Sequence, residues 1–244
     1  AGATEADPAG ILENAMRIGK FTGKALATLD ILAPHGSAAE RIILLGLGKP
    51  EAITAHDWLR AGGAAAAKVR KADAVTIFLD APGVDVTAKA AADFALGMEM
   101  NAYSFDTYKT KKDEDEDRTS KKPVKVTIVT AVASEAKKLA AVTDAVAGGV
   151  FLARDLVNLP PNALGPIEFA DKARELEELG VEVEILTEKE MTKLGMGALL
   201  GVAQGSVRPP RLAIMKWNGG KAKEQPIAFI GKGVVFDSGG ISIK

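Results

Sequence analysis

The chain has no cysteine and only two histidines, His35 and His56, among its 244 residues. The absence of thiols excludes disulfides, thiolate nucleophiles and cysteine-based zinc sites. Two histidines are also too few for a multi-histidine metal cage. Any metal would therefore have to be held mainly by carboxylates or by a less usual ligand.

Long apolar runs and an excess of charge are absent as well. No apolar stretch reaches the roughly 18 residues that a membrane helix needs. The opening AGATEADPAG shows neither the basic nor the apolar part of a secretory signal. The formal net charge of −1 argues against a dedicated nucleic-acid binder, because such proteins carry a basic excess. We therefore expect a cytoplasmic protein with no membrane partner.

The first 133 residues predict an α/β domain. Three apolar runs have the composition of buried strands: RIILLGLG (41–48), AVTIFLDAP (74–82) and KVTIVTAV (125–132). The alanine-rich residues 53–70 between the first two runs predict a helix. This order is typical of an α/β domain with a largely parallel or mixed sheet. The charged residues 108–122 predict a solvated loop.

A long helix is expected to connect this domain to a second one. Apolar residues recur at three- and four-residue spacing from Leu139 to Val157, which is the stripe of an amphipathic helix. The segment LPPNALGP (159–166) ends the helix, because proline cannot continue it. We assign the connecting helix to residues 134–158.

Residues 159–244 predict the first part of a second α/β domain. A helix is expected over residues 167–179, and Thr187 with Glu190 has the spacing of a capping box for a short helix ending at Gly195. Predicted strands cover VEVEIL (181–186), GALLGVAQGS (197–206), RLAIMKW (211–217) and PIAFIGK (226–232). A complete domain of this type usually exceeds these roughly 85 residues, so we expect the domain to be truncated.

The chain closes on GKGVVFDSGGISIK (231–244), where Lys232, Asp237 and Lys244 lie among glycines. Neither the spacing of a phosphate loop nor a complete GxGxxG is present. In an uninterrupted strand, Lys232 and Asp237 would lie about 16 Å apart on opposite faces. Gly233 and the pair 239–240 permit chain reversals that would bring the three polar side chains together. A purely structural strand–turn–strand, with glycines serving the turns, stays an alternative on spacing alone. We expect Trp217 and Phe236 to be core residues.

This segment resembles the signature of the leucyl (cytosol) aminopeptidases, the two-metal peptidases of family M17. Two upstream stretches resemble the same family, ARDLVNLPPNALGP (153–166) and LGMGALLGVAQGSVRPPRLAIMKWNG (194–219). The region from Phe21 onward is similar to the family's N-terminal domain. The resemblance implies an N-terminal α/β domain (1–133) without its first strand, a connecting helix (134–158), and the beginning of an α/β/α two-metal aminopeptidase domain (159–244).

The resemblance also implies roles for three residues. Lys232 would bind one metal through its amine, Asp237 would bridge two divalent metals, zinc or manganese, and Lys244 would be the catalytic lysine. A lysine amine ligates only in its neutral form, which an adjacent dication favours over the ammonium form. Lys244 would stay protonated and stabilise the oxyanion that forms when water adds to the scissile carbonyl.

The implied function is the removal of N-terminal residues, leucine preferred, from peptide substrates by a homohexamer. The family's remaining metal carboxylates lie beyond the catalytic lysine, so we expect this chain alone to bind metal weakly and to be inactive. Two alternatives stay open from the sequence. One is a DNA-binding accessory role of the N-terminal domain, against which the near-zero net charge argues, and the other is an inactive fragment.

Overall fold

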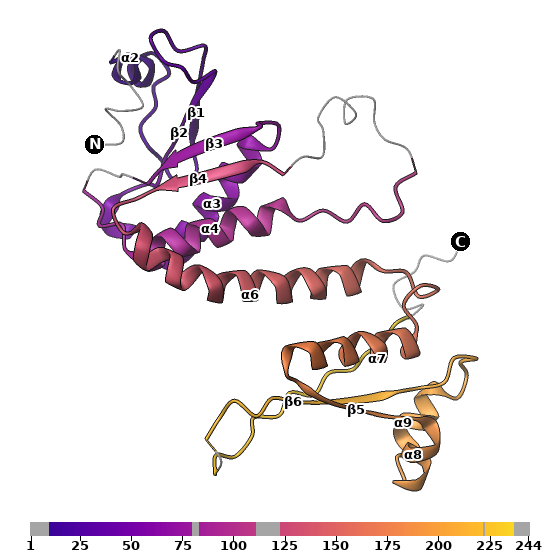
Figure 1. Cartoon of the computed structure of the whole chain (residues 1–244). Coiled ribbons are helices and arrows are strands. Elements are labelled where there is room, and N and C mark those ends of the chain that lie inside the picture. Colours follow the sequence, from indigo (N-terminus) through magenta and orange to yellow (C-terminus); the bar gives the residue numbers. More distant parts are fainter. Residues whose placement is uncertain (1–9, 80–82, 111–122, 222, 237–244) are drawn as a thin grey trace. The chain divides into compact units, whose positions relative to one another are not determined.

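The computed structural model describes residues 10–79, 83–110, 123–221 and 223–236. Helices and strands alternate along the chain (Figure 1), so the predicted α/β class is confirmed. The chain groups into two compact units, Ala1–Leu152 and Ala153–Lys244, and the boundary lies inside a long helix, α6 (Ala133–Asn158). Within the described part of the chain, no helix combines the length and the apolar character that crossing a membrane requires.

The first unit contains two strand pairs. β1 (Thr28–Leu32) and β2 (Arg41–Leu45) run antiparallel, whereas β3 (Ala74–Phe78) and β4 (Lys125–Val129) run parallel. Both strand directions are therefore present, but the described residues divide them between two separate sheets. The predicted strands at 41–48, 74–82 and 125–132 are confirmed in shortened form as β2, β3 and β4.

Helices cover these strands. The remaining helical elements of the first unit are α2 (Ile11–Ile18), the short 3-10 helix η1 (Pro50–Ala52), α3 (Ala55–Val69) and α4 (Ala88–Ala102). A capping box starts α3: the Thr54 hydroxyl accepts a bond from the backbone N–H of Asp57, and the Asp57 carboxylate accepts from the backbone N–H of Thr54 at 3.0 Å. The box satisfies backbone donors that have no partner within the helix.

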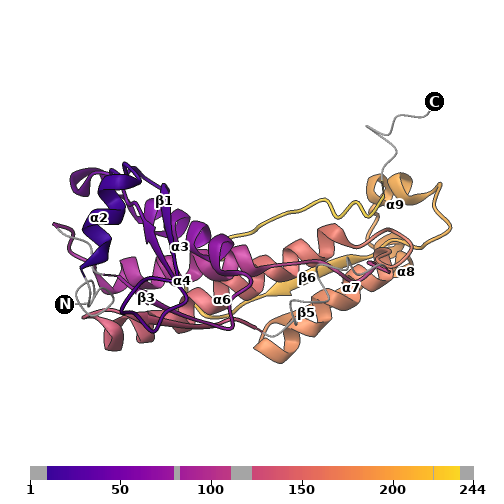
Figure 2. The same ribbon diagram turned by 90° about the horizontal axis from the view of Figure 1, so that it is seen from above.

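The core of the first unit forms where α3 and α4 cross. Trp58 and Ala61 of α3 and Phe94 of α4 are 5%, 1% and 2% exposed, and the two helices lie side by side in Figures 1 and 2. Two glycines permit the close approach: a Cβ on Gly62 would overlap the Phe94 carbonyl, and a Cβ on Gly97 would overlap the Leu59 carbonyl. The helix backbones are therefore in direct contact at the crossing.

The predicted connecting helix is confirmed in its extent. α6 ends at Asn158, two residues before the double proline at 160–161, because proline lacks the N–H that a helix needs and its ring clashes with the preceding turn. Within the first unit, the ring of Phe151 on α6 packs against Tyr103, with centroids 5.3 Å apart. This contact fixes α6 to the end of α4.

The second unit packs α7 onto a strand pair (Figure 1). Its elements are α7 (Pro166–Arg174), the 3-10 helix η2 (Glu175–Leu179), β5 (Glu182–Leu186), α8 (Glu188–Lys193), α9 (Gly197–Ala203) and β6 (Leu212–Lys216). β5 and β6 are antiparallel. Buried side chains between these elements include Leu164, Ala170, Leu186 and Met191.

Several details of the second unit differ from the sequence prediction. Residues 197–206 are not a strand but contain the helix α9, because periodicity alone does not distinguish a helix from a strand in so short an apolar run. Residues 226–232 form no strand: Ile227 and Phe229 are 83% and 93% exposed, and no described strand pairs with them. The predicted core residues Trp217 and Phe236 are 69% and 63% exposed, so that prediction was wrong. The helix predicted over 167–179 changes to 3-10 geometry at Glu175.

The glycine contact between α3 and α4 leads to a stability prediction. Gly62→Ala should lower the free energy of unfolding by about 1–3 kcal/mol, because the added methyl group meets the Phe94 backbone and the helices must separate. Urea-induced unfolding followed by circular dichroism measures the change.

Gly148→Ala in α6 is the matched control. A Cβ at Gly148 has no neighbour within 4 Å, and alanine is the better helix former, so this variant should gain about 0.5–1 kcal/mol. A Gly62→Ala variant that is as stable as the wild type, or a Gly148→Ala variant that is destabilised as much as Gly62→Ala, would contradict this packing.

The capping box of α3 leads to a second prediction. Hydrogen bonds from the Thr54 side chain and backbone lower the pKa of Asp57 below its ordinary value of 3.8. A lowered folded-state pKa means that the box stabilises the fold at pH values above 3.8 and loses this effect as the pH falls through the lowered value. Asp57→Asn should therefore be less stable than the wild type at neutral pH, and the difference should shrink in acid. Thermal unfolding of both proteins across this range measures it, and a difference independent of pH would refute the assignment.

Candidate metal centre

Lys232 is the one residue of the predicted site that the structure describes. It lies in a segment without helix or strand, residues 226–236, and its side chain is exposed. Asp237 and Lys244 lie outside the described residues. The convergence of the three side chains therefore stays a prediction.

The donor chemistry of the described residues fits a metal centre only in part. Lys232 presents an exposed amine, which is a usable nitrogen ligand in its neutral form. No group of three or more histidine or carboxylate side chains that could hold a metal occurs in the described part of the chain. Further ligands must therefore come from residues other than the described ones, and the predicted bridging Asp237 is such a residue.

Gly233, directly after Lys232, packs against α7. A Cβ on Gly233 would lie 3.1 Å from Cε1 and 3.5 Å from Cδ1 of the Phe169 ring. The 3.1 Å distance is tighter than most such contacts and the 3.5 Å distance is ordinary, so the ring would have to shift by a few tenths of an ångström to admit a side chain at position 233. Phe169 is half-buried and lies on the second turn of α7. The segment that carries Lys232 thus rests on this helix.

The start of α7 is held by an arginine that sequence reasoning did not single out. Arg208 donates from Nη1 to the carbonyl of Pro161 at 2.9 Å and from Nη2 to the carbonyl of Asn162 at 3.3 Å. These bonds join the loop between α6 and α7 to the connection between α9 and β6. Loop carbonyls that enter no helix or strand need such donors.

A carboxylate completes this cluster. Glu168 accepts a bond from the backbone N–H of Gly165 at 3.0 Å and lies 3.8 Å from Nη1 of Arg208. Gly165 is buried, and a Cβ there would overlap the guanidinium of Arg208. A side chain at position 165 would therefore force the ends of Arg208 and Glu168 to move, whereas the φ angle of Gly165 at the N-cap, −90°, is one that any residue adopts.

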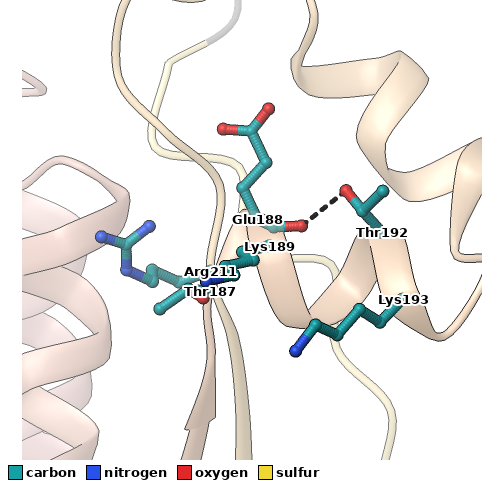
Figure 3. Close-up of a pocket in the computed structure, with 6 residues that line it drawn as sticks. All are labelled: Thr187, Glu188, Lys189, Thr192, Lys193 and Arg211. Atoms are coloured by element: carbon teal, nitrogen blue, oxygen red, sulfur yellow. Dashed lines mark hydrogen bonds between the residues drawn. The ribbon is translucent and has the colours of Figure 1, made fainter.

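A separate surface hollow lies at α8 (Figure 3). It is lined by Thr187, Glu188, Lys189, Thr192, Lys193 and Arg211. The Glu188 carboxylate, the Lys193 amine and the Arg211 guanidinium point in different directions in Figure 3, and the bond drawn joins the Thr192 hydroxyl to the backbone carbonyl of Glu188 at 2.8 Å. The charged groups do not converge, so the hollow does not offer a binding site for one ligand. Beside it, hydrogen bonds from Thr187 lower the pKa of Glu190, which confirms the predicted capping box.

The Arg208 cluster leads to a prediction for the second unit. Arg208→Ala should lower its free energy of unfolding by about 1.5–3 kcal/mol, because two bonds from a charged donor are lost and the loop carbonyls lose their partners. Arg208→Lys should recover only part of this, since an ammonium group lacks the planar fork that reaches both carbonyls. Urea-induced unfolding followed by circular dichroism measures both variants.

Arg174→Ala is the control for the loss of an arginine at the surface. Arg174 faces Asp171 at 3.4 Å on α7, and both side chains are more than half exposed. A pair of this kind contributes less than about 1 kcal/mol. An Arg208→Ala variant as stable as Arg174→Ala would show that the loop does not depend on the guanidinium.

Comparison with known proteins relates both units to one family. The sequence model of the family described as "Cytosol aminopeptidase family, N-terminal domain" matches residues 1–112. A second family model, described as "Cytosol aminopeptidase family, catalytic domain", matches residues 151–244. Among curated relatives, the probable cytosol aminopeptidase of Sinorhizobium fredii is 70% identical over 244 residues, covering 100% of this chain and 49% of the relative. That of Agrobacterium fabrum is 67% identical over the same lengths. The chain spans about half the length of the curated relatives it matches.

Solved structures of other proteins share the fold of this chain. The bottromycin maturation enzyme BotP in complex with Mn superimposes with a TM-score of 0.67 at 27% identity, over 82% of this chain and 41% of BotP. A mutant of tomato leucine aminopeptidase gives a TM-score of 0.68 at 23% identity, over 86% of this chain and 42% of the plant chain. The signature residues 231–244 fall within the matched catalytic domain. The chain belongs to the cytosol aminopeptidase family.

Proposed function

We propose that the full-length protein is a metal-dependent aminopeptidase that releases N-terminal residues, preferably leucine, from peptides. The observation that carries this proposal is the match of two domain models of one peptidase family to residues 1–112 and 151–244, with the signature GKGVVFDSGGISIK inside the second match. The Mn reported for BotP supports a divalent metal as cofactor. Two ions per subunit, manganese or zinc, are part of the proposal.

Three residues of the chain carry the proposed chemistry. Lys232 and Asp237 would hold the metals through an amine and a carboxylate, and Lys244 would keep its proton and donate to the oxygen of the scissile carbonyl. When bound, the metals would supply Lewis-acid activation of water and of the carbonyl.

Location and assembly belong to the same proposal. The names of the relatives support a cytosolic enzyme, and the family resemblance supports a homohexamer with peptides as its substrates. The 244 residues supply two of the proposed ligands, Lys232 and Asp237. Two dications need more ligands than these, so the isolated chain should bind metal weakly and show no peptidase activity.

Variants of the full-length protein test the roles of the three residues. Lys232→Ala and Asp237→Ala should each lower metal affinity by at least about tenfold, together with the turnover rate, because each removes a ligand. Lys244→Ala should retain the metals and lower kcat about 100- to 1,000-fold, as expected for the loss of one oxyanion donor. Metal content by plasma mass spectrometry and hydrolysis of a leucine anilide give the two readouts.

Lys221→Ala is the matched control. The Lys221 side chain is 90% exposed, and its pair with Glu224 is long, at 3.9 Å, so this variant should keep both metal and activity. Full turnover by the Lys244→Ala protein would remove its assigned role, and full metal content in Lys232→Ala would remove that lysine from the ligand set.

A further inference from the structure

Asn218 is followed directly by Gly219, and it is the one asparagine of the sequence with a glycine after it. The other four asparagines, at positions 14, 101, 158 and 162, precede alanine or leucine. The side chain of an asparagine is of a length that lets the next backbone nitrogen attack its amide carbon and close a five-membered imide ring. A side chain on the following residue hinders this attack, and glycine has none. The sequence therefore favours ring closure at Asn218 over the other positions.

The backbone nitrogen of Gly219 is not held in a helix or a strand. Asn218 and Gly219 follow β6, which ends at Lys216, in a segment without regular structure. Within the described part of the chain, neither the side-chain amide of Asn218 nor the backbone N–H of Gly219 takes part in a hydrogen bond. The attacking nitrogen and the amide that it would attack are therefore both uncommitted.

The other asparagines differ at this nitrogen. Two of them lie in α2 and α4, and the residue after each belongs to the same helix, where its N–H donates to the preceding turn. The backbone N–H that follows Asn158 donates to the carbonyl of Asp155 at 3.0 Å. The N–H that follows Asn162 donates to the carbonyl of Pro160 at 2.9 Å. Among the described residues, Asn218 alone combines a following glycine with an uncommitted backbone nitrogen.

We propose that Asn218 is a site of spontaneous deamidation. The backbone nitrogen of Gly219 loses its proton to water and attacks Cγ of Asn218, which forms the new N–C bond of a succinimide ring. The bond from Cγ to the side-chain nitrogen breaks, and this nitrogen takes up a proton and leaves as ammonia. Water then opens either carbonyl of the ring and yields aspartate or isoaspartate at position 218. One water is consumed and one ammonia is released, and nothing is oxidised or reduced.

The products change the chain directly after β6. Both place a carboxylate two residues beyond Lys216, where the unmodified chain carries a neutral amide. Isoaspartate also lengthens the main chain by one carbon, because the peptide then runs through the former side chain. An enzyme that methylates isoaspartyl carboxylates is the class of partner that would recognise this product. The reaction needs neither a metal nor peptidase activity, so it is independent of the proposed function.

Mass spectrometry of the full-length protein, incubated without metal at mildly alkaline pH, tests the proposal. The tryptic peptide 217–221 contains Asn218 as its only asparagine. Conversion of this peptide should increase with time and with pH, because the attacking nitrogen must lose its proton. The peptides that contain the other four asparagines should stay unconverted over the same period, and a sample digested at time zero corrects for conversion during digestion. Equal conversion in any of those peptides would contradict the role of the free nitrogen.

Asn218→Gln tests the assignment, since glutamine would have to close a six-membered ring and reacts far more slowly. An isoaspartyl methyltransferase should label peptide 217–221 of the incubated wild type, and Asn218→Gln should lose this label. Asn162→Gln is the matched control and should keep the label, because the backbone carbonyl of Asn162 that binds Arg208 is unchanged by the substitution. A wild-type peptide without label, or conversion that begins only after the protein is unfolded in urea, would overturn the proposal.

Discussion

The second unit depends on one interaction, the binding of two loop carbonyls by the guanidinium of Arg208. The loop contains a double proline, so it cannot satisfy its carbonyls by continuing a helix. Once the arginine fixes the loop, Gly165 and Glu168 start α7 at a defined place. The orientation of α7 then determines where its aromatic ring meets the backbone after Lys232.

Much of the fold follows from local sequence. The apolar runs at β2, β3 and β4, the alternation in β5 and the stripe along α6 all predict elements that the structure contains. These signals succeed because apolar periodicity distinguishes helices from strands within a short window of sequence, although the stripe residues Val142 and Val157 of α6 are 64% and 85% exposed. The capping boxes that begin at Thr54 and Thr187 also mark helix starts locally, because the two residues of each box are three positions apart in the sequence.

Other features depend on contacts between distant parts of the chain. α9 and residues 226–232 have similar apolar sequences, and only their surroundings decide that one is a helix and the other irregular. The bond from Arg208 to Pro161 spans 47 residues, and no periodicity marks it. The roles of Lys232, Asp237 and Lys244 come from the resemblance of their segment to a family signature, because spacing alone permits their convergence without demonstrating it. The described part of the chain adds to this the packing of Gly233 on Phe169.

The central claim is that the segment 231–244 carries ligands of a metal centre in the full-length enzyme. Anomalous diffraction from crystals of that protein grown with Mn²⁺ would locate each metal ion directly, whatever the activity of the preparation. The account predicts two peaks per subunit. Both should lie within bonding distance of the Asp237 carboxylate, and one of them should also lie within bonding distance of the Lys232 amine. Manganese peaks held only by other residues, with both of these side chains directed away, would contradict it.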